Sequence, residues 1–196
     1  MAINLLEKTT AALGYSALKK IDPTTEEIHQ QSVDANQALA QAVIPAVLAG
    51  ISQLSKSEDG INIIMSGSKT DWANLIFGDH KSEITGNIAG YAMSDLTTIE
   101  NKINEVALTA ITLIREINPD STNNNKMVKD FIKSQRDNIL PFLPTQLHLG
   151  SMMNNSTIDD KTNKMQGPIS SLMHKIEASF GGNETEQDAD KKSNTT

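Results

Sequence analysis

Four histidines have the broadest chemical capacity in this chain, because imidazole acts as an acid, a base and a metal ligand near neutral pH. They are His29, His80, His148 and His174, and each falls on a different predicted element. No two of them are three or four residues apart, the spacing that places two ligands on one face of a metal-binding helix. We interpret them as surface or half-buried histidines and predict no metal site.

The other polar clusters also fall short of known chemical motifs. Asp159 and Asp160 could bind a hard cation, but a solvated loop explains them better. Residues 118–126, "NPDSTNNNK", are rich in oxygen ligands, yet they lack the glycine and the glutamate that a calcium loop needs at its sixth and twelfth positions. Residues 66–69, "SGSK", match neither a nucleophile elbow nor a phosphate-binding loop. We therefore predict no catalytic residue and no cofactor.

Composition narrows the class of protein further. The 196 residues carry a net charge of -7, contain no cysteine and are only 4% aromatic. Without cysteine, thiol catalysis and disulfides are excluded. A core of Leu, Ile, Val, Ala and Met favours helices over sheets. The negative charge and scattered Lys and Arg argue against nucleic acid as a partner. A helix-turn-helix around Gly90–Asn104 is disfavoured because Glu100 and Glu105 oppose the single Lys102.

Two stretches bear on membranes and location. The first 18 residues have no basic start and no long apolar run, so we expect mature protein and not a signal peptide. The most apolar run, Ala38–Ile51, is too short to span a bilayer and contains Gln41 and Pro45. We therefore expect no membrane span and a cytoplasmic protein.

The period of the apolar residues predicts helices along most of the chain. One covers residues 3–13 and ends at Gly14. A second starts at Asp22–Pro23 and reaches Leu54, either as one long helix or as two joined at Pro45, and we expect a kink at this proline. Residues 55–60 form a loop, and the apolar residues 61–65 favour a helix or a 3₁₀ turn because no partner strand exists.

Further helices follow, each with its own start signal. Thr70 and Asp71 can cap residues 72–77, with Trp72 as a core anchor, and Asp79 can cap residues 84–93. Gly86 and Gly90 in the latter helix predict close packing of a neighbouring backbone. The regular helix 96–117 starts with a capping box of Thr97 and Glu100 and ends before Pro119.

These elements predict an all-α bundle of about six to eight helices. We expect an N-terminal subdomain at residues 1–118, a polar linker at 119–125, a C-terminal helical segment at 126–182 packed on the subdomain, and a disordered tail at 183–196. The last predicted helix has Pro168 at its start and Gly181-Gly182 at its end. Its apolar face comprises Ile169, Leu172, Met173, Ile176 and Phe180.

Residues 134–150, "SQRDNILPFLPTQLHLG", form a distinctive corner, interrupted at Pro141 and ended at Gly150. It contains six large apolar residues: Ile139, Leu140, Phe142, Leu143, Leu147 and Leu149. We predict that this corner is buried and clamps the C-terminal segment against the apolar face of residues 96–117. The alternative is partial exposure, with Ile139, Phe142, Leu143 and Leu147 as a partner surface.

Four segments together resemble the bacterial domain of unknown function 937 family, the YidB-like proteins, and in particular its longer members from Bacteroidetes-type bacteria. The segments are "AVIPAVLAGI", "WANLIFGDHKSEITGNIAGYA", the corner itself and "DDKTNKMQGPISSLMHKIEASF". The resemblance covers about residues 1–180. It implies an all-helical fold and no activity, and it transfers no site residues.

Two functions of different class remain. The favoured one is a non-enzymatic helical protein that binds another, unknown protein or organises an assembly, because amphipathic helix is abundant and converging polar residues are not evident. The alternative is a small-ligand-binding protein or an enzyme whose site is assembled from distant residues, with His80, Asp79, Asp71 and His148 as candidates.

Overall fold

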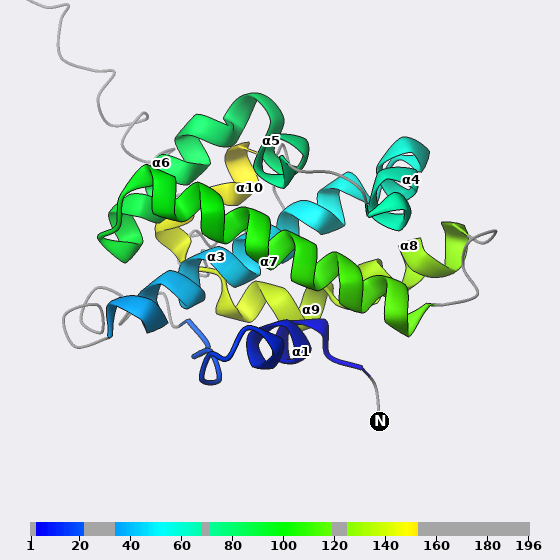
Figure 1. Cartoon of the computed structure of the whole chain (residues 1–196), viewed down its shortest axis with the longest axis horizontal. Coiled ribbons are helices and arrows are strands. Elements are labelled where there is room, and N and C mark those ends of the chain that lie inside the picture. The colour runs from blue at the N-terminus through cyan, green and yellow to red at the C-terminus, as the bar shows by residue number, and fades with distance from the viewer. Residues whose placement is uncertain (1–2, 22–33, 68–70, 119–124, 153–196) are drawn as a thin grey trace, which may run out of the picture. The chain divides into compact units, whose positions relative to one another are not determined.

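The computed structural model describes residues 3–21, 34–67, 71–118 and 125–152, and the regular elements in these ranges are all helical (Figure 1). Six of them have eight residues or more: α1 (Leu5–Ala12), α3 (Ala35–Leu54), α4 (Glu58–Ser66), α6 (Lys81–Ala92), α7 (Leu96–Ile117) and α8 (Asn125–Ser134). Shorter elements are α5 (Trp72–Phe77), η2 (Gly78–His80), α9 (Arg136–Ile139), η4 (Leu140–Phe142), η5 (Thr145–Leu147) and α10 (Leu149–Met152). The predicted all-α fold is confirmed.

The described ranges belong to one compact unit, residues 1–163. The predicted helix at 168–180, the tail at 183–196, His29, His174 and the pair Asp159-Asp160 lie outside the described residues. The predicted divisions at 118, 126 and 183 therefore stay predictions.

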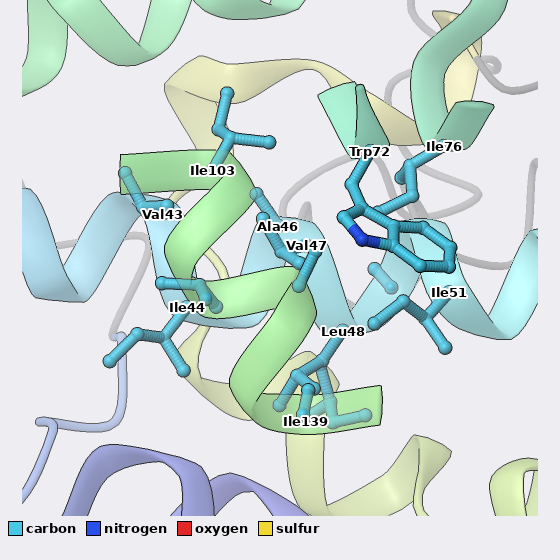
Figure 2. Close-up of a cluster of buried hydrophobic side chains, with 14 of the residues drawn as sticks. Val43, Ile44, Ala46, Val47, Leu48, Ile51, Trp72, Ile76, Ile103 and Ile139 are labelled. Atoms are coloured by element: carbon cyan, nitrogen blue, oxygen red, sulfur yellow. The ribbon is translucent and has the colours of Figure 1, made fainter. Parts of the chain in front are cut away.

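Helix α3 forms the centre of this unit. Thirteen consecutive residues, 39–51, are buried on every side of the helix, because α1, α5, α6, α7 and α9 all pack against it. Figure 2 shows this packing: Ile103 of α7, Trp72 of α5 and Ile139 of α9 surround the α3 side chains. A helix that is apolar all round is stable in water only when it is enclosed in this way.

Among the described helices, α3 is also the one that is long and apolar enough to cross a membrane. However, 72% of its most apolar window is buried inside the protein. This burial identifies α3 as the core helix of the fold.

Gln41 is the polar exception within α3, and its amide fastens two other segments to the helix. Its Oε1 accepts a hydrogen bond from the backbone of Lys19 at 2.9 Å, and its Nε2 donates to the carbonyls of Lys19 at 3.0 Å and Phe142 at 2.7 Å. Nearby, the Ile21 amide donates to the Pro141 carbonyl at 2.8 Å. Because both polar atoms of the Gln41 side chain have hydrogen-bond partners, its burial leaves no polar group of this side chain unpaired.

The α3 helix runs through Pro45 as a single helix, but it does not begin where we predicted. Its first residue is Ala35, and Asp34 has a non-helical backbone (φ -53°, ψ 135°) and accepts hydrogen bonds from the amides of Asn36 and Gln37. A capping residue cannot lie inside a helix, so one helix from Asp22 to Leu54 is wrong. The proposed start at Asp22 itself lies outside the described ranges.

Two other predicted caps are also wrong. Helix α7 is capped by Asp95 instead of Thr97 and Glu100, since the Asp95 carboxylate accepts from the Thr98 amide at 2.9 Å and the Thr98 hydroxyl at 2.6 Å. These hydrogen bonds, chiefly the one from the Thr98 hydroxyl, lower the pKa of Asp95. Asp79 lies in η2 and does not cap α6, whose first turn receives no side-chain cap.

The short apolar segment 61–65 is helical as predicted, but its helix starts earlier. Ser57 caps α4 by accepting from the Gly60 amide at 3.0 Å, so residues 58–60 belong to the helix and not to a loop. The acidic first turn, Glu58 and Asp59, fits the positive end of the helix dipole.

Candidate functional site

The four candidates for a site assembled from distant residues lie at helix ends or in a 3₁₀ turn: Asp71 before α5, Asp79 and His80 in η2, and His148 after η5. Asp71 caps α5 by accepting from the Asn74 amide at 3.1 Å. His80 Nδ1 lies 3.9 Å from Glu83 Oε2 on the surface, and His148 is exposed at the end of η5. In the described part of the chain, no group of three or more His, Asp or Glu side chains could hold a metal ion.

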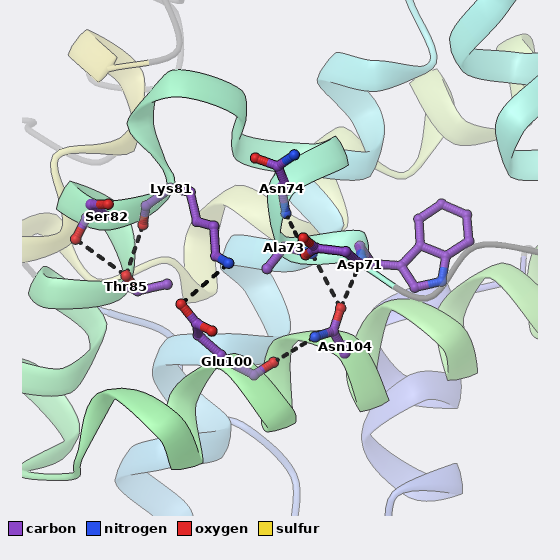
Figure 3. A network of polar contacts seen from close by, with 9 residues as sticks. Asp71, Ala73, Asn74, Lys81, Ser82, Thr85, Glu100 and Asn104 are labelled. Atoms are coloured by element: carbon purple, nitrogen blue, oxygen red, sulfur yellow. Dashed lines mark hydrogen bonds and ion pairs between the residues drawn. The ribbon is translucent and has the colours of Figure 1, made fainter.

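A polar network joins α5, α6 and α7 (Figure 3). Asn104 Oδ1 accepts from the amides of Trp72 at 2.7 Å and Ala73 at 3.2 Å, and Asn104 Nδ2 donates to the Glu100 carbonyl. Lys81 Nζ lies 3.2 Å from Glu100 Oε1. Asn104 therefore satisfies helix N-terminal amides that α5 cannot satisfy itself, and the network fixes α5 and α6 on α7.

The corner, residues 134–150, is part of the core. Leu147 is 0% exposed, and Ile139, Leu140, Leu143 and Leu149 are buried as well. Of the four residues considered as a partner surface, only Phe142 keeps partial exposure. Burial, the favoured alternative, is confirmed.

The surroundings of the corner differ from our prediction. Its turns pack mainly on α3, α6 and α1 instead of α7, because Gln41 and Ile21 bind the backbone at Phe142 and Pro141. In addition, Gln135 Oε1 accepts from the Leu5 amide at 2.9 Å and ties α1 to the start of the corner. Gly150 does not end the corner, since it lies inside α10.

Helix α6 presents an open face. Gly86 and Gly90 are exposed, and in the described part of the chain no neighbouring atom lies within 4 Å of a Cβ built at either position. The described residues therefore do not provide the predicted close packing at these glycines. Glycine inside a helix costs roughly 0.5–1 kcal/mol relative to alanine, and the described part of the fold offers no packing gain in return.

Met93 ends α6 in an unusual way. Its backbone is left-handed, with φ 48° and ψ 47°, and its side chain is 83% exposed. This helix-end position normally belongs to glycine, because a Cβ is strained there. Three other left-handed positions at helix ends in the described residues are Gly14, Gly67 and, at the end of η5, His148. Met93 therefore combines backbone strain with an exposed apolar side chain.

Leu96 extends the apolar character of this region. Five large hydrophobic residues of the described chain are exposed: Ile3, Met93, Leu96, Leu108 and Met127. Among these five, only Met93 and Leu96 are close in sequence, three positions apart. Leu96 is 55% exposed. We call the exposed residues Gly86, Gly90, Met93 and Leu96 together the Met93 surface.

Sequence reasoning missed Met93 as a candidate residue. The available signal was a junction between two helices, "YAMSDL", in which Met93 stands where a glycine would end the first helix. Gln41, Asn104 and Gln135 were missed too, because their partners are distant in sequence.

Three substitutions in the Met93 surface should stabilise the protein. Gly86→Ala and Gly90→Ala should each raise the free energy of unfolding by about 0.5–1 kcal/mol, and Met93→Gly should raise it by about 1 kcal/mol because the strained backbone is relieved. Urea unfolding of the single variants measures all three effects. A loss of stability at either glycine would show that its neighbourhood is more crowded than the structure indicates.

The comparisons with known proteins identify no relative. No protein-family model, no curated protein and no solved structure matches this chain.

Proposed function

We propose that this chain is a non-enzymatic helical protein that binds another protein through the Met93 surface. The observation that carries the proposal is Met93 itself, a strained and 83% exposed apolar residue at a helix end. Local strain is retained at functional sites, where the rest of the fold over-determines it.

Three further features support this assignment. Methionine side chains are flexible and polarisable and adapt to varied protein surfaces. The open glycines leave room for a partner backbone to approach α6 closely, as small residues spaced by four do between membrane helices. The net charge of -7 favours a protein over nucleic acid as the partner.

The proposal includes the wider assignments made from sequence. We propose that the protein is bacterial and cytoplasmic and that it is related to the domain of unknown function 937 family. The order of the four resembling segments and the all-helical fold support the relationship.

Site-specific photo-crosslinking in the native cell tests the function. A benzophenone amino acid at position 93 should produce a discrete crosslinked band that contains a second protein. The matched control is position 112 on α7, which is also exposed but lies about 24 Å along the helix axis from Leu96. Equal crosslinking from both positions, or none from position 93, would contradict the proposal.

A further inference from the structure

We infer that Met93 is an oxidation site, at which a hydroperoxide converts the thioether to methionine sulfoxide and thereby releases the protein partner. This inference rests on the proposed function, because it assigns a means of regulation to the same surface. It adds the modified atom, Met93 Sδ, and the chemical class of the oxidant.

The sulfur content of the chain directs oxidants to methionine. The sequence contains eight methionines and no cysteine. Cysteine thiolates are the usual targets of peroxides in proteins. Their absence leaves the thioethers as the sulfur groups of this chain that a peroxide can oxidise.

Exposure distinguishes Met93 from the other methionines whose side chains the structure describes. Met93 is 83% exposed and Met127 is 56% exposed, whereas Met65 is partly buried against the core. Because a peroxide must reach the sulfur, susceptibility to oxidation follows exposure. Among these three methionines, Met93 should therefore react first.

The backbone around Met93 holds this side chain in solvent. The amides of Met93 and Ser94 both donate to the carbonyl of Ala89, which closes the last turn of α6. Asp95 caps α7 only two residues after Met93. The connection is thus fixed at both ends, and withdrawing Met93 from solvent would require one of the two helices to unwind.

The reaction transfers one oxygen atom and two electrons. A lone pair of Met93 Sδ attacks one oxygen of hydrogen peroxide, and the O–O bond breaks as the S–O bond forms. The departing hydroxide takes the proton of the transferred hydroxyl and leaves as water, so sulfur is oxidised and the peroxide is reduced. A polar, chiral sulfoxide then replaces a flexible apolar thioether.

The sulfoxide opposes binding because its oxygen is a hydrogen-bond acceptor. A partner that covers the Met93 surface removes water from this oxygen, and burying a polar group without a hydrogen bond costs free energy. The other side chains of the surface, at Gly86, Gly90 and Leu96, contain no donor that could replace the water. By reciprocity, a bound partner shields Met93 Sδ and slows its oxidation.

A peroxide titration of the full-length protein, with a photo-crosslinking residue at position 96, tests the inference. The purified protein is treated with hydrogen peroxide, freed of the oxidant, added to native cell extract and irradiated. Peptide mass spectrometry measures the sulfoxide at Met65, Met93 and Met127. Sulfoxide should appear first at Met93, and the crosslinked band should fall about tenfold as Met93 is converted. Methionine sulfoxide reductase with a thiol reductant should restore the band.

Two substitutions separate Met93 from the other methionines. Met127→Leu should leave the peroxide sensitivity of the band unchanged, because Met127 lies outside the Met93 surface. Met93→Leu removes the sulfur and keeps an apolar side chain, so the band that this variant gives should not change with peroxide. If Met93→Leu gives no band, the titration still decides, because the loss in the parent chain must follow the sulfoxide at Met93.

Each outcome has a defined meaning. A band that persists after full conversion of Met93, or a loss that does not follow the sulfoxide at Met93, overturns the inference and leaves the proposed function standing. Slower conversion of Met93 than of Met127 or Met65 also overturns the inference. If no band forms before oxidation, the proposed function is wrong and the inference fails with it.

Discussion

Leu143→Ala and Leu147→Ala should each lower the free energy of unfolding by about 2–5 kcal/mol, the usual range for buried leucine. Leu147 is fully buried and Leu143 nearly so, and the turns that carry them pack on α3 and α6. Pro141 and Pro144 stiffen these turns, so the surrounding chain has little freedom to collapse into the cavity that alanine leaves. Urea or thermal unfolding measures the effect.

Phe142→Ala provides the matched control for the corner. Phe142 is only partly buried, although its carbonyl accepts a hydrogen bond from Gln41 that the substitution leaves in place. We expect a smaller loss than at Leu143. If Phe142→Ala costs more than Leu143→Ala or Leu147→Ala, the burial pattern of the corner is wrong.

Gly50→Ala should destabilise the protein by about 1–3 kcal/mol, the range for overpacked cores. A Cβ at Gly50 would lie 2.0 Å from Ile76 Cγ2 and 3.2 Å from Phe77 Cε1. The Ile76 methyl cannot rotate away freely because β-branched side chains are stiff, so α3 and α5 would have to separate. Denaturant unfolding reports the change.

Gly90→Ala is the control for this substitution, because it adds the same methyl group to another helix. No neighbouring atom of the described residues lies within 4 Å of the added Cβ at that position, so the gain in helix propensity should dominate. The two variants should therefore change stability in opposite directions. A change of the same sign in both would contradict the contrast between a crowded glycine in α3 and an open glycine in α6.

The sequence predicted the elements better than their contacts. The apolar period of α7 placed its end at Ile117, and the capping residues Thr70 and Asp71 together with Gly78 bounded α5 to within one residue, because these signals are local. The start of α7 was harder to predict, since Asp95 and Thr97 are both good caps and lie two residues apart. The structure selects Asp95, which leaves Thr97 inside the helix.

The spacing of apolar residues does not predict contacts between residues that are far apart in the sequence. In the sequence, Gln41 is a polar residue within an apolar helix. Its side chain makes three hydrogen bonds to the backbone of Lys19 and Phe142, and Phe142 is 101 residues away. A glycine has no side chain whose polarity indicates burial or exposure, so the sequence does not distinguish the crowded Gly50 from the exposed Gly90. The strained position of Met93, by contrast, had a local signal, because the junction "YAMSDL" places this residue where a glycine would end α6.

We propose that Gly86, Gly90 and Met93 lower the stability of the protein but are needed to bind its partner. One comparison tests this most directly. A photo-crosslinking residue is placed at position 96, within the Met93 surface, in the natural sequence and in the Gly86→Ala, Gly90→Ala, Met93→Gly variant. We predict that the variant is more stable by about 2–3 kcal/mol and loses most of its crosslinked partner. A stabilised variant that captures its partner as well as the natural protein would contradict the claim.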